Sequence, residues 1–251
     1  MQRSLPRAGS APLPAFKRRS EVILSHIREK GNRSEYLLFG KNMNMDAKIK
    51  ELRVVPVVVL NDAKDAAPLA KALIAGGLPV AEVTFRTDAA EGSIQDIRAE
   101  FPDMIVGAGT ITSVEQAKRA TAAGAKFLVT PGFSDEVTAY ALEHNVPIYP
   151  GICTPTELMA GLKYNLKVFK FFPASQYGGL STIKALSGPF PGVRFMPTGG
   201  ISVSNLKEYL SSPKVIACGG SWMVKGDLIA AGKFDEIERL TREAVALTKE
   251  V

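Results

Sequence analysis

The sequence predicts an α/β protein in which residues 46–251 form a single (β/α)8 barrel that opens with an N-terminal helix. From residue 50 onward, short apolar runs rich in β-branched residues alternate with helical stretches, and this alternation repeats eight times. The runs are apolar almost throughout, which is typical of parallel strands covered by helices. Eight strand–helix units in about 200 residues indicate a compact barrel.

The predicted elements follow from these local patterns, taken in chain order. The strands are VVPVVVL (54–60), PVAEVTF (79–85), MIVGAGT (104–110), KFLVTPG (126–132), PIYPGI (147–152), VFKFFPA (168–174), RFMPTGG (194–200) and VIACGGS (215–221). Stretches with a helical apolar period lie between them and after the last one, and they predict helices at 65–77, 113–124, 134–145 and 235–250.

A doubly wound open sheet is the alternative arrangement of the same units. Such a sheet would bind a nucleotide at its switch point. The best candidate for that fingerprint, GAGTIT (107–112), has two of the three glycines and no acidic partner at a suitable distance. The barrel is therefore the preferred prediction.

Length and charge exclude two classes of protein. The longest apolar run in the 251 residues is VVPVVVL, far shorter than the roughly 18 residues of a membrane span, so we expect no integral membrane segment. The net charge of +6 lies in residues 1–45, which carry nine Lys or Arg and three Asp or Glu, whereas residues 46–251 carry 22 of each sign. The main body therefore shows no electrostatic footprint for nucleic acid.

Residues 1–45 form a basic extension that lacks an apolar core of secretory-signal length. Three interpretations stay open: a disordered tail, an Arg-rich organelle transit segment, or translated upstream sequence ahead of a start at Met43 or Met45. We favour the last interpretation, because MDAKIKELRVVPVVVL opens like the first helix and strand of a domain.

Cysteine and histidine are too scarce for a disulfide framework or a metal site. Cys153 and Cys218 end apolar runs and form no CxxC pair, which favours small buried residues in a reducing compartment, with the cytoplasm as the expected location. His26 lies in the extension, and His144 ends a predicted helix, where a cation is ordinary helix chemistry.

The strand VFKFFPA carries one lysine inside an otherwise apolar run. Side chains alternate with period two along a strand, so Phe169 and Phe171 share one face, and Lys170 lies on the other. If the phenylalanines face the covering helices, Lys170 faces the barrel axis. In the strand 79–85 the same alternation places Glu82 on one face, together with Thr84 and the following Arg86.

A buried ammonium and a buried carboxylate are costly unless they pair or become neutral. The structural interpretation is that Lys170 reaches the barrel mouth or only pairs with Glu82. The functional interpretation is a reactive site, where perturbed groups concentrate, and we favour it. Desolvation by the Phe-rich strand and repulsion from Arg86 favour an uncharged amine, which attacks carbonyl groups and forms a Schiff base. Such a site needs a proton shuttle, and Glu82 is the candidate.

Glycine pairs end the last two predicted strands. RFMPTGG ends with Gly199 and Gly200, and VIACGGS ends with Gly219, Gly220 and Ser221. Glycines let backbone N–H groups approach an anion, and the loops after strands seven and eight of a (β/α)8 barrel often bind phosphate. One glycine pair alone is common in turns, but two pairs at the expected strand ends predict a phosphate site.

Seven motifs follow one another between residue 82 and residue 222: EVTFR (82–86), GAGT (107–110), TPG (130–132), PGICTPTE (150–157), FKFFPA (169–174), GPFPGVRFMPTGG (188–200) and GGSW (219–222). Through them the sequence, from about residue 50 to the C-terminus, resembles the 2-keto-3-deoxy-6-phosphogluconate (KDPG) aldolases, which include 4-hydroxy-2-oxoglutarate (KHG) aldolases. The resemblance implies that Lys170 forms the Schiff base and that Glu82 is the general acid/base. It also implies substrate contacts from Arg86, Thr110, Pro131, Gly199, Gly200, Gly220 and Ser221.

The activity implied by the resemblance is that of a class I aldolase of the Entner–Doudoroff pathway. This carbon–carbon lyase would cleave 2-dehydro-3-deoxy-6-phosphogluconate to pyruvate and glyceraldehyde 3-phosphate, and would also act on 4-hydroxy-2-oxoglutarate. The family is trimeric and metal-independent, so we expect a homotrimer without metal or other cofactor. We expect a small phosphorylated 2-keto acid as the binding partner, and neither nucleic acid nor membrane.

Three alternatives stay open. An aldolase for the galactonate epimer would use the same lysine. A metal-dependent aldolase would need a cluster of histidine and carboxylate ligands, for which the sequence has few candidates. A non-catalytic phosphate-ligand-binding barrel or an assembly subunit would have no need for both Lys170 and Glu82.

Overall fold

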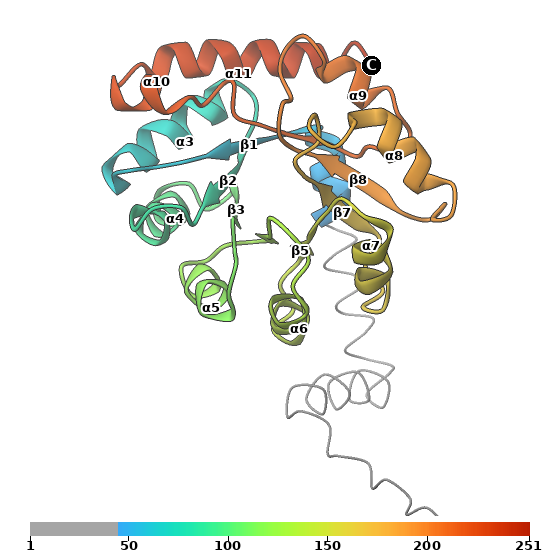
Figure 1. The fold of residues 1–251 in the computed structure, drawn as a ribbon. Coiled ribbons are helices and arrows are strands. Elements are labelled where there is room, and N and C mark those ends of the chain that lie inside the picture. Colours follow the sequence, from blue (N-terminus) through green and yellow to red (C-terminus); the bar gives the residue numbers. More distant parts are fainter. Residues whose placement is uncertain (1–44) are drawn as a thin grey trace, which may run out of the picture. The chain divides into compact units, whose positions relative to one another are not determined.

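The computed structural model describes residues 45–251, whose strands form a central layer with helices packed outside it (Figure 1). Residues 45–52 are helical, which confirms the predicted helix ahead of the first strand. The three interpretations of the basic extension concern residues 1–45. Of these, only Met45 belongs to the described range, so the interpretations lie outside what the structure describes.

Within the described residues, nine strands occupy the positions of the eight predicted runs. They are β1 Val54–Val58, β2 Val80–Thr84, β3 Ile105–Gly109, β4 Leu128–Val129, β5 Ile148–Tyr149, β6 Gly151–Ile152, β7 Val168–Phe171, β8 Arg194–Pro197 and β9 Cys218–Gly220. The predicted strand 147–152 is divided into β5 and β6 at Pro150, which has no N–H to donate to a ladder. The strands are shorter than the predicted runs, and several of the run ends lie in loops.

Every strand pair among these residues is parallel, and the strands form two sheets. Their orders are β5-β4-β3-β2-β1-β9 and β6-β7-β8. Two isolated bridges link the neighbourhoods of β8 and β9. Phe195 in β8 pairs with Val215, which precedes β9, and Thr198, which follows β8, pairs with Gly219 in β9. The predicted α/β class is therefore confirmed as a curled, parallel arrangement (Figure 1).

The helices lie between consecutive strands and after the last one. They are η1 Ala63–Asp65, α3 Ala66–Ala75, α4 Ala89–Glu100, α5 Val114–Ala122, α6 Asp135–Glu143, α7 Pro155–Leu162, α8 Gly179–Ser187, α9 Leu206–Leu210, α10 Gly226–Ala230 and α11 Phe234–Thr248. The four helices predicted from periodicity correspond to α3, α5, α6 and α11. The last of these, α11, packs beside α3 (Figure 1).

Side-chain caps determine where three helices begin. The hydroxyls of Ser113, Ser134 and Thr154 accept hydrogen bonds from backbone N–H groups in the first turns of α5, α6 and α7. Glu157 completes a capping box at α7, because its carboxylate accepts from the N–H groups of Thr154 and Cys153 at 2.8 Å each. The capping box thus fixes the loop that leaves β6.

The outer face of β7 packs on α7. Phe169 and Phe171 are fully buried, as the period-two alternation predicts for the face turned towards the helices. Gly161 in α7 lies so close to Phe169 that a Cβ at this position would overlap the phenyl ring. This contact seats the strand that carries Lys170.

We expect Gly161→Ala to lower the free energy of unfolding, although alanine is the better helix former by about 1 kcal/mol. The added Cβ must displace the ring of Phe169 in a packed core, and overpacking of this kind typically costs about 1–3 kcal/mol. Urea unfolding followed by circular dichroism measures the difference. Gly192→Ala is the control, because a Cβ there meets nothing within 4 Å. An unchanged midpoint for Gly161→Ala would contradict the close α7–β7 contact.

Candidate active site

Lys170 and Glu82 meet in the interior although they come from different sheets. Lys170 lies in β7 and Glu82 in β2. Lys170 Nζ donates a hydrogen bond to Glu82 Oε1 over 3.4 Å, and the two residues are 3% and 2% exposed. The structure therefore brings together Lys170, which was predicted to face the barrel axis, and Glu82, which the alternation placed on the polar face of its strand.

One aromatic ring lies beside the amine. Lys170 Nζ lies 4.9 Å from the ring centroid of Phe172, within cation–π distance. On the opposite face of β7, Phe171 packs edge-to-face on Phe195, with the ring centroids 6.4 Å apart. The amine thus has one carboxylate and one aromatic face as close neighbours and little contact with water.

This geometry allows a proton to pass directly between the two side chains. A buried charge that loses its ionic partner strongly destabilises the folded protein. The two groups must therefore stay paired as ions or become neutral together. Transfer of a proton from Lys170 Nζ to Glu82 turns an ammonium and a carboxylate into a neutral amine and a neutral acid. The site then holds a nucleophile and an acid that is ready to return the proton.

Gly109 provides the space that the Glu82 carboxyl group occupies. It ends β3, which pairs with β2 in a parallel register. A Cβ at Gly109 would overlap the Glu82 carboxyl group. Sequence reasoning assigned no role to this glycine of the GAGT motif, because the contact depends on the register of two strands.

Arg86 and Thr110 lie together just beyond the ends of β2 and β3. Arg86 Nε donates a hydrogen bond to Thr110 Oγ1 over 3.1 Å. Arg86 is exposed, so the structure places its charge at the rim and not buried beside Lys170. Thr110 has a φ of 56°, a left-handed conformation that β-branched residues rarely adopt and that is often found at functional sites.

Pro131 lies against the strand next to the lysine strand. Gly151 pairs in register with Lys170, and a Cβ at Gly151 would overlap the carbonyl group of Pro131. Thr130 holds this turn, because its hydroxyl accepts from Gly151 N over 3.1 Å and donates to the carbonyl of Gly132 over 2.6 Å. The backbone around Pro131 is therefore part of the wall beside β6 and β7.

Thr198, which directly follows β8, forms a bridge with Gly219 in β9 and so brings the carboxyl ends of these two strands together. Gly199 and Gly200 have φ values of 95° and 76°, which residues with a side chain rarely adopt. Among the described residues, no backbone carbonyl accepts a hydrogen bond from the N–H of Gly199, Gly200 or Ser221. Unpaired N–H groups on neighbouring glycine loops are suited to binding an anion.

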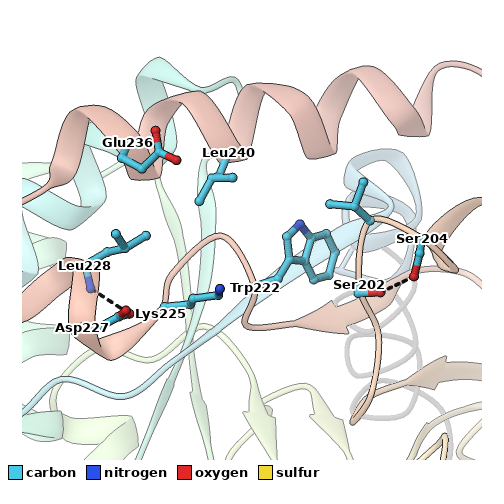
Figure 2. A pocket seen from close by; sticks show the side chains of 9 residues that line it. Ser202, Ser204, Trp222, Lys225, Asp227, Leu228, Glu236 and Leu240 are labelled. Atoms are coloured by element: carbon cyan, nitrogen blue, oxygen red, sulfur yellow. Dashed lines mark hydrogen bonds between the residues drawn. The ribbon is translucent and has the colours of Figure 1, made fainter.

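A groove adjoins these loops on the side of α10 and α11 (Figure 2). Its lining consists of Ser202, Val203, Ser204, Trp222, Lys225, Asp227, Leu228, Glu236 and Leu240. The Trp222 ring fills the space that a Cβ at Gly220 would need. Neither Lys170 nor Glu82 lines this groove, so it is distinct from the buried pair.

Cys153, Cys218 and His144 lie outside the buried Lys170–Glu82 pair. Cys218 is buried, as expected, whereas Cys153 is only half-buried, because it lies past the end of β6. Burial raises the pKa of both thiols, and the Glu157 carboxylate raises that of Cys153 further. His144 Nδ1 lies 2.9 Å from the Tyr140 carbonyl, beside the end of α6.

Residues 45–251 lack two kinds of feature. No group of three or more His, Cys, Asp or Glu gathers there in a way that could hold a metal ion. No helix in this part of the chain is long and apolar enough to cross a membrane.

Known proteins are similar to this chain in sequence and in fold. The model of the family "KDPG and KHG aldolase" matches residues 45–240. The chain is 49% identical over 199 residues to the 2-dehydro-3-deoxy-phosphogluconate aldolase of Treponema pallidum, an alignment that covers 79% of this chain and 95% of that protein. It is 48% identical over 192 residues to the KHG/KDPG aldolase of Escherichia coli K12, which covers 76% and 90% of the two chains.

Among solved structures, the KDPG aldolase of Legionella pneumophila, with pyruvate captured as a covalent carbinolamine intermediate, has a TM-score of 0.75 and 42% sequence identity. The match covers 77% of this chain and 93% of that one. The sequence comparisons and the fold comparison point to the same family as the motifs around Lys170 and Glu82. The chain therefore belongs to the KDPG and KHG aldolase family.

Proposed function

We propose that this protein is a class I aldolase that cleaves 2-dehydro-3-deoxy-6-phosphogluconate to pyruvate and glyceraldehyde 3-phosphate through a Schiff base on Lys170. The observation that carries the proposal is the buried contact of 3.4 Å between Lys170 Nζ and Glu82 Oε1. It supplies a nucleophilic amine and a proton shuttle at one place. The relatives named above, including one captured with covalently bound pyruvate, support the same chemistry.

Formation of the Schiff base requires two proton transfers to the substrate oxygen. Glu82 first takes a proton from Lys170, and the free amine attacks the C2 carbonyl while Glu82 protonates its oxygen. Glu82 then removes a proton from the nitrogen, which gives a neutral carbinolamine. Protonation of the C2 hydroxyl by Glu82 lets water leave, and the product is an iminium ion with Glu82 again a carboxylate.

Cleavage uses the iminium as an electron sink. Glu82 takes the proton of the C4 hydroxyl, the C3–C4 bond breaks, and its electron pair moves to the iminium to form an enamine. Glyceraldehyde 3-phosphate leaves. Glu82 then protonates C3 of the enamine, and water hydrolyses the resulting iminium, which releases pyruvate and restores Lys170.

Binding groups at the rim fit the two charged ends of this substrate. The guanidinium of Arg86, beside Thr110, matches a planar carboxylate. Backbone N–H groups of the loops after β8 and β9 would hold the phosphate, through Gly199, Gly200, Gly220 and Ser221. Pro131 would contribute to the wall near the reacting carbons.

We further infer that the two sheets close into a (β/α)8 barrel over residues 46–251. The bridges between β8 and β9, and the continuity of β5 and β6 through Pro150, support closure. We propose a cytoplasmic homotrimer that acts without metal or other cofactor, and that binds neither nucleic acid nor membrane. Residues 1–45 would then be an extension outside the aldolase domain.

Other substrates would use the same lysine. The galactonate epimer and 4-hydroxy-2-oxoglutarate are the two candidates, and the second lacks a phosphate. Cleavage rates of the gluconate-derived and galactonate-derived substrates, measured on one purified sample, distinguish the epimers. A barrel that binds ligand without catalysis would show no turnover of any of them.

Reduction with borohydride in the presence of pyruvate tests the Schiff base. We expect the peptide that contains Lys170 to gain the mass of the reduced pyruvate adduct, because borohydride reduces the iminium to a stable amine. Peptide mass spectrometry makes the measurement. Lys170→Arg should show no gain, whereas Lys126→Arg, at an exposed lysine, should be labelled like the wild type. Unlabelled wild-type protein would end the proposal.

Glu82→Gln tests the proton shuttle. The amide keeps the size of the side chain and can contact the amine, but it cannot take a proton, so we expect kcat to fall by about 10²–10⁴-fold. A coupled assay for pyruvate release gives the rate. Glu143→Gln, on the exposed side of α6, should leave kcat unchanged. If Glu82→Gln keeps more than about half of the wild-type kcat, another group must carry the proton.

A further inference from the structure

The amide of Asn205 holds the loop that joins β8 to α9. Asn205 Nδ2 donates a hydrogen bond to the carbonyl of Gly200 over 2.9 Å, and Oδ1 accepts one from the N–H of Ser202, also over 2.9 Å. A backbone carbonyl can only accept and an N–H can only donate, so one orientation of the amide satisfies both contacts. The side chain therefore fastens the backbone on both sides of Ile201.

Gly199, the preceding residue of the loop, is held by the segment that follows the neighbouring strand β7. The N–H of Ser175, which lies after β7, donates to the carbonyl of Gly199 over 3.1 Å. A Cβ at Gly200 would overlap the Ser175 side chain, so only glycine fits there. The carbonyl groups of both glycines are thus engaged by the protein.

These contacts determine where the neighbouring N–H groups point. In a trans peptide, the carbonyl of one residue and the N–H of the next point in opposite directions. Engagement of the Gly199 carbonyl by Ser175 turns the Gly200 N–H away from Ser175. In the same way, engagement of the Gly200 carbonyl by Asn205 turns the Ile201 N–H away from Asn205.

Neither N–H group has a backbone acceptor. No backbone carbonyl among residues 45–251 accepts from the N–H of Gly200, which is an exposed residue, or from that of Ile201, which is only 7% exposed. Backbone donors in buried positions are nearly always paired, with the protein, with water or with a ligand. Donors of this kind on successive residues of a glycine loop are suited to an anion.

We propose that Asn205 is a positioning residue for recognition of the substrate phosphate. It acts through the Gly200–Ile201 peptide, whose N–H it directs at the anion, and it does not touch the substrate itself. The inference rests on the proposed function, because it assumes a phosphorylated substrate bound at this loop. It adds a residue outside the glycine motifs and predicts that binding of the phosphorylated end and Schiff-base formation can be separated.

The test compares two steps of the reaction in Asn205→Ala. We expect KM for 2-dehydro-3-deoxy-6-phosphogluconate to rise roughly ten-fold, as for loss of one hydrogen bond to a charged group, with kcat unchanged. We also expect inorganic phosphate to become a weaker competitive inhibitor. The rate of borohydride trapping with pyruvate, which carries no phosphate, should equal that of the wild type.

Two further variants control for the fold. Ser204→Ala removes an exposed hydroxyl of the same loop, whose hydrogen-bond partner is the Ser202 hydroxyl at 2.8 Å, and it should leave both steps unchanged. Asn205→Asp keeps the size and the acceptor but loses the donor to Gly200, so it should also raise KM, and it replaces the alanine variant if that one does not fold.

The outcomes separate the two proposals. If wild-type protein is not labelled by pyruvate and borohydride, the aldolase proposal fails. If labelling is normal but neither variant of Asn205 changes KM, or if KM and the trapping rate change by the same factor, the role of Asn205 is overturned.

Discussion

A hydrogen bond between two ionisable groups that water barely reaches, Lys170 Nζ to Glu82 Oε1, imposes the constraints that the rest of the structure meets. Such a pair is tolerated only when both partners are held in place, because either ion alone in the interior is strongly unfavourable. The outward packing of Phe169 on Gly161 seats the lysine strand, and Gly109 leaves room for the carboxyl group. The packing of β7 on α7 therefore fixes the strand that carries Lys170, and the missing side chain of Gly109 leaves the space that the Glu82 carboxyl group occupies.

The rim is built by a different principle from the interior. Rigid side chains fill the core, whereas backbone groups and their hydrogen bonds shape the loops at the carboxyl ends of the strands. Thr110 and Gly199 both adopt positive φ values, and hydrogen bonds hold the segments that contain them. This conformation is strained at the β-branched Thr110 and persists there only where surrounding contacts determine it, whereas Gly199 adopts it without strain. In the proposed function, the rim binds the charged ends of the substrate, and the interior performs the proton transfers.

The sequence predicted those features that depend on neighbours along the chain. Period-two alternation is a local property, so it placed Lys170 on the face opposite Phe169 and grouped Glu82 with the polar residues of its own strand. Contacts that depend on strand register or loop conformation could not be predicted in this way. The space that Gly109 leaves for Glu82 requires β2 and β3 in register, and the exposed position of Arg86 follows from where β2 ends.

The division of the predicted strand 147–152 into β5 and β6 does have a local cause, because Pro150 lacks the N–H that a continuous ladder would need.

A crystal structure of the protein soaked with pyruvate tests the central claim most directly. The account predicts continuous electron density from Lys170 Nζ to C2 of pyruvate, with the Glu82 carboxyl group within hydrogen-bond distance of the adduct. Pyruvate joined to another residue, or bound in the interior without a bond to Lys170, would contradict it.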